Sequence, residues 1–287
     1  MRPYLILHLA VLVAGFTGIL GKAITLNEGL LVWYRVLFAA ILLFFIVKVI
    51  FRKNRLHTRE KVEIVKVGML LTLHWVFFYA SIKYSNVSIG VVCYCLCGFF
   101  TSLFKPMIEK SKFLLSELML SILSVLGIGL IFHFDAAYRT GIVLGVISAA
   151  LGALYTIFNA RIVKKYDNLT INYYQMLGGT VGLGLLLPVY LHFFPVERFL
   201  PSLNDTFYLI LLALFCTVGL YYALVEALKK IPVFTINLSF NLEPIYSILL
   251  AFLFFNESKE VNFAFYTGLA IIIISVVLQT LKSYHKN

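Results

Sequence analysis

Charged residues are scarce in this sequence. Asp, Glu, Lys and Arg make up 13% of the 287 residues, whereas 61% of residues are hydrophobic and the mean hydropathy is +0.95. A soluble domain has about 25% charged and about 45–50% apolar residues. A chain of this length cannot build a core large enough to hide so much apolar surface from water, so lipid must cover its exterior. The composition therefore excludes a soluble fold.

Cysteine and acidic residues are also few. The four Cys residues, Cys93, Cys95, Cys97 and Cys216, lie inside apolar stretches and have no spacing typical of a disulfide framework or a zinc site. We therefore expect no metal and no cofactor. Only 13 acidic residues oppose 24 basic ones, which gives a net charge of +11. Because the basic residues occur in short runs between apolar stretches, they indicate membrane topology rather than nucleic-acid binding.

Motifs for energy coupling and catalysis are missing as well. The sequence contains no P-loop, no acidic phosphorylation motif, no His-rich box, and no paired Asp or Ser-His arrangement at the cytoplasmic helix ends. Direct use of ATP therefore has no support. An integral-membrane enzyme acting on lipids and a non-transporting scaffold both stay open at this point.

What the sequence has instead is long apolar runs, each close to the roughly 20 residues that a transmembrane helix needs. Ten such runs lie near residues 4–21, 30–50, 64–82, 87–105, 113–133, 140–160, 172–194, 207–227, 233–255 and 262–281. They are continuous and lack the alternation of barrel strands, so we predict helices. The first run has no small-residue cleavage site after it, and we interpret it as a retained helix rather than a signal peptide.

The basic residues indicate the orientation of these helices. With ten spans, 18 of the 24 Lys and Arg residues fall on the side that holds both chain ends, and the loop 51–61 contributes most to this excess. Because basic loops stay in the cytoplasm, we predict a multi-pass protein of the cytoplasmic (inner) membrane with both termini cytoplasmic.

Three short motifs recur in the same order in the two halves of the chain. They pair Trp33–Leu37 with Tyr173–Leu177, Ala80–Lys83 with Ala227–Lys230, and Glu109 with Glu257, at separations of 140, 147 and 148 residues. The pattern predicts a duplication, with one half at 1–137 and the other at 138–287. Each half has five helices, and an odd number of crossings inserts the two copies in opposite orientations. Inverted repeats are typical of alternating-access transporters and not of scaffolds.

Several short motifs carry a resemblance to a known family. They are Gly15 to Lys22, Arg35, and the series Tyr221–Leu224, Leu242–Pro244 and Phe255–Glu257. With them the chain resembles the drug/metabolite transporter superfamily, specifically its EamA-type members. The resemblance implies ten helices in two five-helix halves and transport of small metabolites such as amino acids and their derivatives. The first half departs from the motif, because its counterpart to Leu242–Pro244 contains no proline.

Polar residues within the ninth apolar run are candidates for a substrate cavity. Glu243 is the deepest ionisable residue, and such a residue needs a partner, a watery cavity or a role because its burial in lipid is costly. Asn237 and Asn241 lie four residues apart and share a helix face. Either these side chains line a cavity, with Glu243 as a proton acceptor, or Glu243 is protonated or paired and only holds helices together.

Further candidates lie in three other runs. Arg35 is placed to attract an anionic substrate or to extend to the interface, and Gln175 is its counterpart in the second half. His74, Trp75 and Tyr79 form a polar and aromatic face that either lines a cavity or packs.

Taken together, these observations predict an all-α membrane protein that acts as a secondary transporter, without enzymatic activity. Its partners are the lipid bilayer and a small-molecule substrate, an amino acid or a related compound, bound in a cavity near the midplane. Whether it exports this substrate, and whether protons couple the transport, is left open.

Overall fold

The fold is described from a computed structural model of the chain, for residues 2–50, 56–113, 115–134, 136–232, 236, 239–240 and 242–284. This part of the chain is helical and contains no strand. The helices are α1 (Arg2–Ala23), α2 (Glu28–Ile50), α3 (Thr58–Tyr84), α4 (Val87–Tyr94), α5 (Cys97–Glu109), α6 (Leu115–Phe134), η1 (Ala136–Tyr138), α7 (Arg139–Ile162), α8 (Asn168–Phe193), α9 (Leu203–Ala213), η2 (Leu214–Gly219), α10 (Leu220–Leu228), α12 (Glu243–Phe255), η3 (Glu257–Lys259) and α13 (Phe263–Tyr284).

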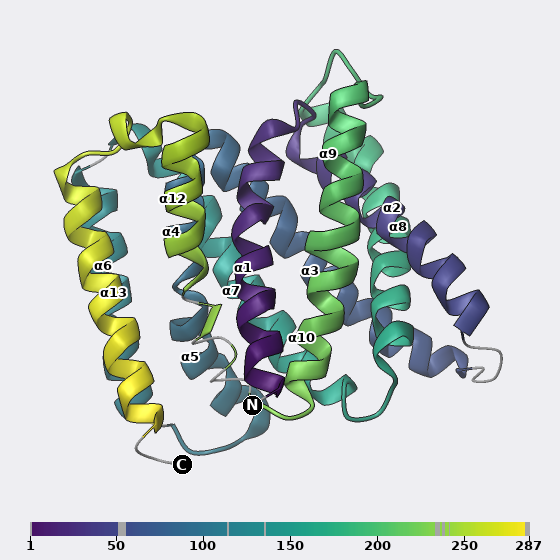
Figure 1. Cartoon of the computed structure of the whole chain (residues 1–287), viewed down its shortest axis with the longest axis horizontal. Helices are drawn as coiled ribbons and strands as arrows, with labels where there is room; N and C mark the ends of the chain where they lie inside the picture. Colours follow the sequence, from purple (N-terminus) through teal and green to yellow (C-terminus); the bar gives the residue numbers. More distant parts are fainter. Residues whose placement is uncertain are drawn as a thin grey trace.

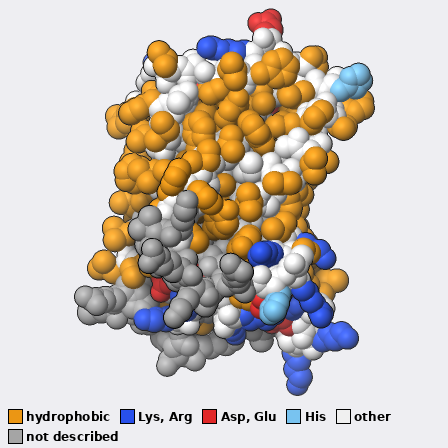
Figure 2. Space-filling view, turned by 90° about the vertical axis from the view of Figure 1, so that its right-hand side faces the viewer, with side chains coloured by type: hydrophobic (Ala, Val, Ile, Leu, Met, Phe, Trp, Pro, Cys, Tyr) orange, Lys and Arg blue, Asp and Glu red, His pale blue; other side chains and the backbone are white. Residues whose placement is uncertain are grey.

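These helices form because their backbone groups, buried in lipid, can only be satisfied within the segment itself. Seven of the described helical segments are long and apolar enough to cross a membrane, and three shorter apolar helices accompany them, at Ser121–Ile131, Glu243–Phe255 and Phe263–Ser275. Figure 2 shows the resulting apolar band, with Lys and Arg side chains gathered mainly below it. The predicted all-helical class is confirmed for the described residues, and the count of ten spans stays a prediction.

The two ends of the described chain lie on the same side of the bundle. Arg2 begins α1 and Tyr284 ends α13 at the lower side in Figure 1, which we call the terminal face. The other side, which we call the opposite face, carries the connections 24–27, 85–86 and 256–262.

Helices from the two predicted halves interleave. The first-half helix α1 packs against α10 and α12, and α3 packs against α7 and α8. At the two ends of the bundle, α6 pairs with α13 and α2 pairs with α8 (Figure 1). Any cavity in the middle of this arrangement is therefore lined by both halves of the sequence.

Three of the segments are interrupted inside the bundle. Between α4 and α5 the backbone makes tight turns, in which the N–H groups of Cys95 and Leu96 donate to carbonyls three residues earlier, both at 3.1 Å. Between α9 and α10 the chain forms a π-helix, η2. The helix α12 begins only at Glu243, directly before Pro244. Irregular backbone at this depth is tolerated where it is buried in protein or borders a cavity.

Close contact between α3 and α8 depends on Gly68. A Cβ atom at this position would lie 2.5 Å from the Cα of Gln175, whereas a Cβ at Gly129 would meet nothing within 4 Å. We expect Gly68→Ala to lower the free energy of unfolding by about 1–3 kcal/mol through overpacking. Gly129→Ala should leave it unchanged or raise it by up to about 1 kcal/mol. Thermal unfolding of both variants in detergent checks this, and equal stabilities would contradict the close packing.

Candidate functional site

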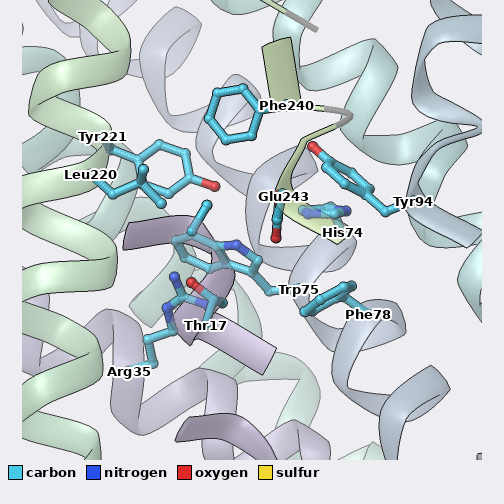
Figure 3. Close-up of a pocket in the computed structure, with 11 residues that line it drawn as sticks. Thr17, Arg35, His74, Trp75, Phe78, Tyr94, Leu220, Tyr221, Phe240 and Glu243 are labelled. Carbon is cyan, nitrogen blue, oxygen red and sulfur yellow. The ribbon is translucent and has the colours of Figure 1, made fainter. Parts of the chain in front are cut away.

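A central cavity lies in the interior of the bundle (Figure 3). Helices from both predicted halves surround it, chiefly α1, α2 and α3 from the first and α10 and α12 from the second. The lining residues are Ala14, Thr17, Arg35, His74, Trp75, Phe78, Tyr94, Leu220, Tyr221, Phe240 and Glu243. They are mostly aromatic, with two charged side chains, which is the composition of a small-molecule site.

A second cavity adjoins the central one. The two share His74, Tyr94, Leu220, Tyr221 and Phe240, and the second also reaches Thr156 and Leu224. Thr156 lies six residues before the end of α7 and Leu224 four residues before the end of α10, and both helices end at the terminal face. The free space therefore extends from the centre toward the terminal face.

Arg35 is fixed by the protein itself. Its side chain is fully buried, and its Nε donates to Thr217 Oγ1, its Nη1 to the Tyr79 hydroxyl and its Nη2 to the Cys216 carbonyl, each at 2.8 Å. The guanidinium carbon lies 3.7 Å from the centre of the Trp75 ring, a cation–π contact. Arg35 thus does not extend to the interface, and three of its five N–H groups are occupied.

The π-helix η2 supplies two of the acceptors for Arg35. The hydroxyl of Thr217 donates to the Leu212 carbonyl, five residues earlier, at 2.9 Å, while its oxygen accepts from Arg35. The Cys216 carbonyl accepts from the same guanidinium. Single π-helical turns are frequent at functional sites. The π-helix η2 could not be predicted from the sequence, because the wider turn of a π-helix depends on the tertiary contacts that stabilise it.

His74 and Trp75 both line the central cavity, and their contact with a substrate stays a prediction. His74 Nδ1 lies 2.9 Å from both the carbonyl and the hydroxyl oxygen of Ser148 in α7, which anchors one side of the ring. Trp75 packs edge-on against Tyr221, with ring centres 5.2 Å apart. The remaining surfaces of the two rings border the cavity (Figure 3).

Two other candidates lie outside the cavity lining. Tyr79 is fully buried beside Arg35 and acts as its hydrogen-bond acceptor. Gln175 is fully buried between α7 and α8, where its Nε2 donates to Asn159 Oδ1 at 2.9 Å. Asn237 and Asn241 lie outside the described residues.

Glu243 has a carboxylate with no hydrogen-bond or ion-pair partner within the described part of the chain, although its side chain is only 6% exposed. It begins α12, where the backbone dipole favours a negative charge, and its carboxylate is directed into the cavity (Figure 3). A buried polar group without a partner calls for an explanation such as a ligand.

Sequence reasoning missed several lining residues, among them Thr17, Phe78, Tyr94, Tyr221 and Phe240. Aromatic residues are common at lipid-facing and interfacial positions, so their type alone does not identify a cavity. Tyr221 lies within a stretch that carries the family resemblance, but that stretch gives no indication of which way the ring points.

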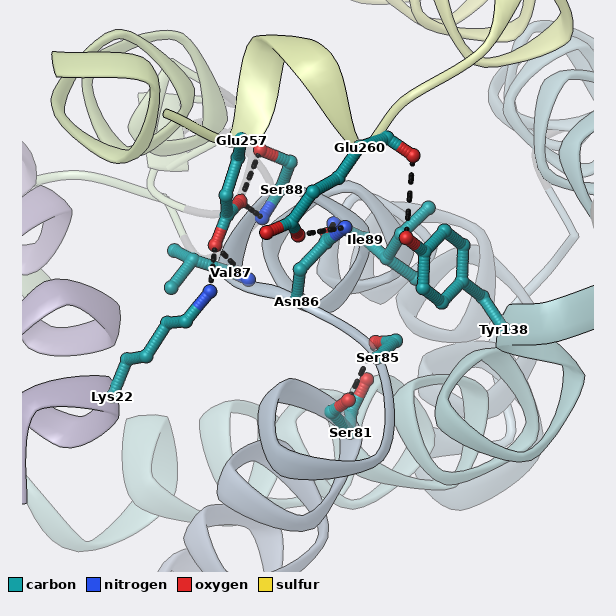
Figure 4. Close-up of polar contacts among 10 residues, drawn as sticks. All are labelled: Lys22, Ser81, Ser85, Asn86, Val87, Ser88, Ile89, Tyr138, Glu257 and Glu260. Carbon is teal, nitrogen blue, oxygen red and sulfur yellow. Dashed lines mark hydrogen bonds and ion pairs between the residues drawn. The ribbon is translucent and has the colours of Figure 1, made fainter. Parts of the chain in front are cut away.

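A second polar arrangement lies at the opposite face (Figure 4). Glu257 is fully buried, and its Oε1 accepts from Lys22 Nζ at 2.7 Å and from the Val87 N–H at 3.0 Å. Its Oε2 accepts from the N–H and the hydroxyl of Ser88, at 2.9 and 2.7 Å. These four residues, the Glu257 cluster, join α1, the start of α4 and the connection after α12.

The carboxylate of the Glu257 cluster sits at the N-terminus of α4, where free N–H groups and the helix dipole favour an anion. Burial alone would raise the pKa of Glu257, but the hydrogen bonds from Lys22, Ser88 and Val87 outweigh it and hold this pKa below its ordinary value of 4.5. The group is therefore ionised at neutral pH and holds three segments together.

Contacts at the two faces differ in burial. At the opposite face the Thr25 N–H and hydroxyl also donate to the buried Asp205, at 2.7 and 2.8 Å. At the terminal face the ion pair Lys165–Glu63, at 2.8 Å, is exposed. The terminal face also has a contact of the buried Asn168, from its Nδ2 to the Tyr222 carbonyl at 2.7 Å. The buried carboxylates with several hydrogen bonds, Glu257 and Asp205, lie at the opposite face.

Comparisons to known proteins identify the family of this chain. The sequence profile described as the EamA-like transporter family matches residues 1–133 and again 139–281. The chain belongs to the EamA-like transporter family. With its apolar helices, this member of the EamA-like family is a multi-pass membrane protein.

Two relatives of this EamA-like protein have been named only in general terms. A protein of Clostridium kluyveri called an uncharacterized transporter is 25% identical over 206 residues, and the uncharacterized transporter YdfC of Bacillus subtilis is 25% identical over 203 residues. The matches cover 69% and 68% of this chain, and the chain spans 65% of the length of each relative.

A solved crystal structure shares the fold. It is 15% identical to this chain and superimposes with a TM-score of 0.69, over 98% of this chain and 97% of the other. At this identity the likeness extends to the arrangement of helices and not to the substrate.

Proposed function

We propose that this chain is a secondary transporter that moves a small metabolite, an amino acid or a related compound, by alternating access around the central cavity. The observation that carries the proposal is the cavity itself, because its polar and aromatic lining comes from helices of both halves. A cavity in such a position lets the substrate be reached from either side as the halves move.

Ten spans in two inverted halves, 1–137 and 138–287, complete the proposal. The seven long and three shorter apolar helices support the count, and the two separate family matches support the division. Because 18 of the 24 basic residues fall on the terminal face under this topology, we assign that face to the cytoplasm.

Closure of the opposite face defines one state of the transport cycle. With the Glu257 cluster formed and the second cavity extending toward the terminal face, the described state is ready to receive a substrate from the cytoplasm. Alternating access passes through such a state in import and in export; we propose export, with protons as the coupling ion moving in the opposite sense and Glu243 as their acceptor.

Transport is tested with the purified protein in liposomes. We expect stereoselective flux of at least one metabolite from a broad panel, faster under a proton gradient than without one. Empty liposomes are the control. If no compound moves while a lipid is chemically converted, the chain is an enzyme and the proposal is wrong.

Topology is tested with single cysteines at two exposed lysines, Lys112→Cys on the terminal face and Lys259→Cys on the opposite face. The native cysteines are all buried, so they contribute little background. We expect a membrane-impermeant thiol reagent outside intact cells to label position 259 and not 112. Labelling of both positions from outside would contradict the assignment.

A further inference from the structure

The two charged groups of the central cavity are not equivalent. Arg35 has hydrogen bonds to three protein acceptors and a tryptophan face against its guanidinium. Glu243 has neither a hydrogen bond nor an ion pair among the described residues. Glu243 is therefore the charged group of this cavity whose hydrogen-bonding capacity is left entirely for a ligand.

An anionic ligand would have to use what remains of Arg35. A carboxylate binds a guanidinium best through two parallel hydrogen bonds. Here one N–H of each terminal nitrogen and the Nε–H already donate to Tyr79, Cys216 and Thr217, and Trp75 covers one face of the group. One N–H of each terminal nitrogen is left for a carboxylate, and any movement of the guanidinium toward such a ligand would strain the contacts that hold α2 to α3 and η2.

A cationic ligand meets a more favourable set of groups. Rings of Phe78, Tyr94, Tyr221 and Phe240 border the same space as the Glu243 carboxylate (Figure 3). Aromatic faces attract cations, and a carboxylate accepts hydrogen bonds from an ammonium group.

Thr17 adds a further acceptor. Its hydroxyl oxygen is buried and has no hydrogen-bond partner among the described residues, and the residue is only 6% exposed and lines the cavity. An ammonium group has three N–H donors and needs more than one acceptor when it leaves water. Glu243 and Thr17 supply two of them in one cavity.

We propose that the central cavity binds a small organic amine in its cationic form, with the ammonium group at Glu243 and the apolar body among the aromatic rings, and that it does not require a carboxylate on the substrate. This inference rests on the proposed transport function and narrows its substrate class.

Matched probes separate the headgroups. Phenethylamine, phenylalanine and 3-phenylpropionate share one apolar body. The first carries an amine, the second an amine and a carboxylate, and the third a carboxylate. Pentylamine, norleucine and hexanoate repeat the series on a slimmer chain. Calorimetric titration of the purified wild-type protein should show the amine of at least one series binding at least tenfold more tightly than the other two members.

Glu243→Gln keeps the shape of the side chain and removes its charge. We expect it to weaken binding of the amine at least tenfold, because a buried charge pair loses one partner. Glu63→Gln makes the same change at an exposed carboxylate outside the cavity and should leave binding unchanged. Because the probe series is measured on the wild type, the inference is tested even if Glu243→Gln fails to fold.

Several results would overturn the inference. If the amino acid binds at least as tightly as the amine, Arg35 takes part and the substrate is zwitterionic. If the carboxylate binds best, the site prefers an anionic ligand. If liposomes transport a compound without an amine while no amine binds, the inference is wrong and the transport function stands. Absence of both flux and binding across the panel would instead remove the transport function.

Discussion

Glu257→Gln should open the opposite face to solvent. In the wild type the carboxylate has four hydrogen-bonding contacts, one of them the ion pair with Lys22 at 2.7 Å. Removing one partner of a buried ion pair costs about 3–5 kcal/mol. Lys22 is 27% exposed, so solvent recovers part of this. A remaining change of about 1.4 kcal/mol still shifts the balance between closed and open states about tenfold.

The measurement uses a reporter inside the cavity. Thr17→Cys places a thiol in the central cavity, in a background with the four native cysteines replaced by Ala. We expect an impermeant thiol reagent added at the opposite face to react about tenfold faster when Glu257→Gln is present. Glu257 does not line the cavity, so a faster labelling rate with Glu257→Gln reports easier access of the reagent to the cavity.

Glu260→Gln is the matched control. Glu260 lies three residues from Glu257, and its carboxylate makes one hydrogen bond, from Asn86 at 3.4 Å (Figure 4). Its substitution should change the labelling rate less than twofold. If the two variants behave alike, the Glu257 cluster does not hold the opposite face closed.

Acid should open the same face only at low pH. A carboxyl group with a lowered pKa stabilises the arrangement fully above its ordinary pKa, and this contribution is lost as the pH falls through the lowered pKa. For Glu257 the ordinary value is 4.5. Because the thiolate fraction of the reporter also changes with pH, the measured quantity is the Thr17→Cys labelling rate with Glu257→Gln divided by the rate without it. This ratio should stay about tenfold from about pH 8 to about pH 5 and fall toward one only below the ordinary value. A fall between pH 7 and pH 6 would assign closure to another group.

Much of the fold could be predicted from the sequence because the bilayer permits so few structures. Long apolar runs must be helical when no water is present to satisfy the backbone, and the described helices follow these runs. The break between α4 and α5 was not predictable from local sequence, since no proline lies between Cys93 and Gly98. It is held by tight turns whose stability depends on the surrounding helices.

The candidate site was predictable where a residue type is costly in lipid. Arg35, His74 and Glu243 need protein or a cavity around them, and all three line the central cavity. Gln175 is also polar and within a helix, but its partner is Asn159 and it does not line the cavity. Which of the two outcomes occurs depends on how α7 and α8 meet, and a single sequence does not contain that geometry.

Arg35→Lys should destabilise the protein even without substrate. Lys carries one ammonium group in place of a planar fork, so it cannot reach Thr217, Tyr79 and the Cys216 carbonyl together, and it loses the stacking on Trp75. Hydrogen bonds to charged groups contribute about 1.5–3 kcal/mol each. We expect a loss of at least about 2 kcal/mol, measured as thermal or chemical unfolding of the substrate-free protein in detergent.

Arg161→Lys makes the same chemical change at an exposed position with one hydrogen bond, of 3.3 Å to the Ile108 carbonyl, and should alter the stability by less than about 0.5 kcal/mol.

A double-mutant cycle separates a positioning role from substrate binding. Thr217→Val removes the acceptor for Arg35 Nε while keeping the shape of the side chain. If Arg35 stabilises η2 through this contact, the effects of Arg35→Lys and Thr217→Val on stability should fall short of additivity by more than about 0.5 kcal/mol. Additive effects, or an Arg35→Lys variant as stable as the wild type, would mean that Arg35 acts on the substrate instead. In that case the two unused N–H groups of Arg35 would bind the substrate, and the cavity would recognise a carboxylate on it.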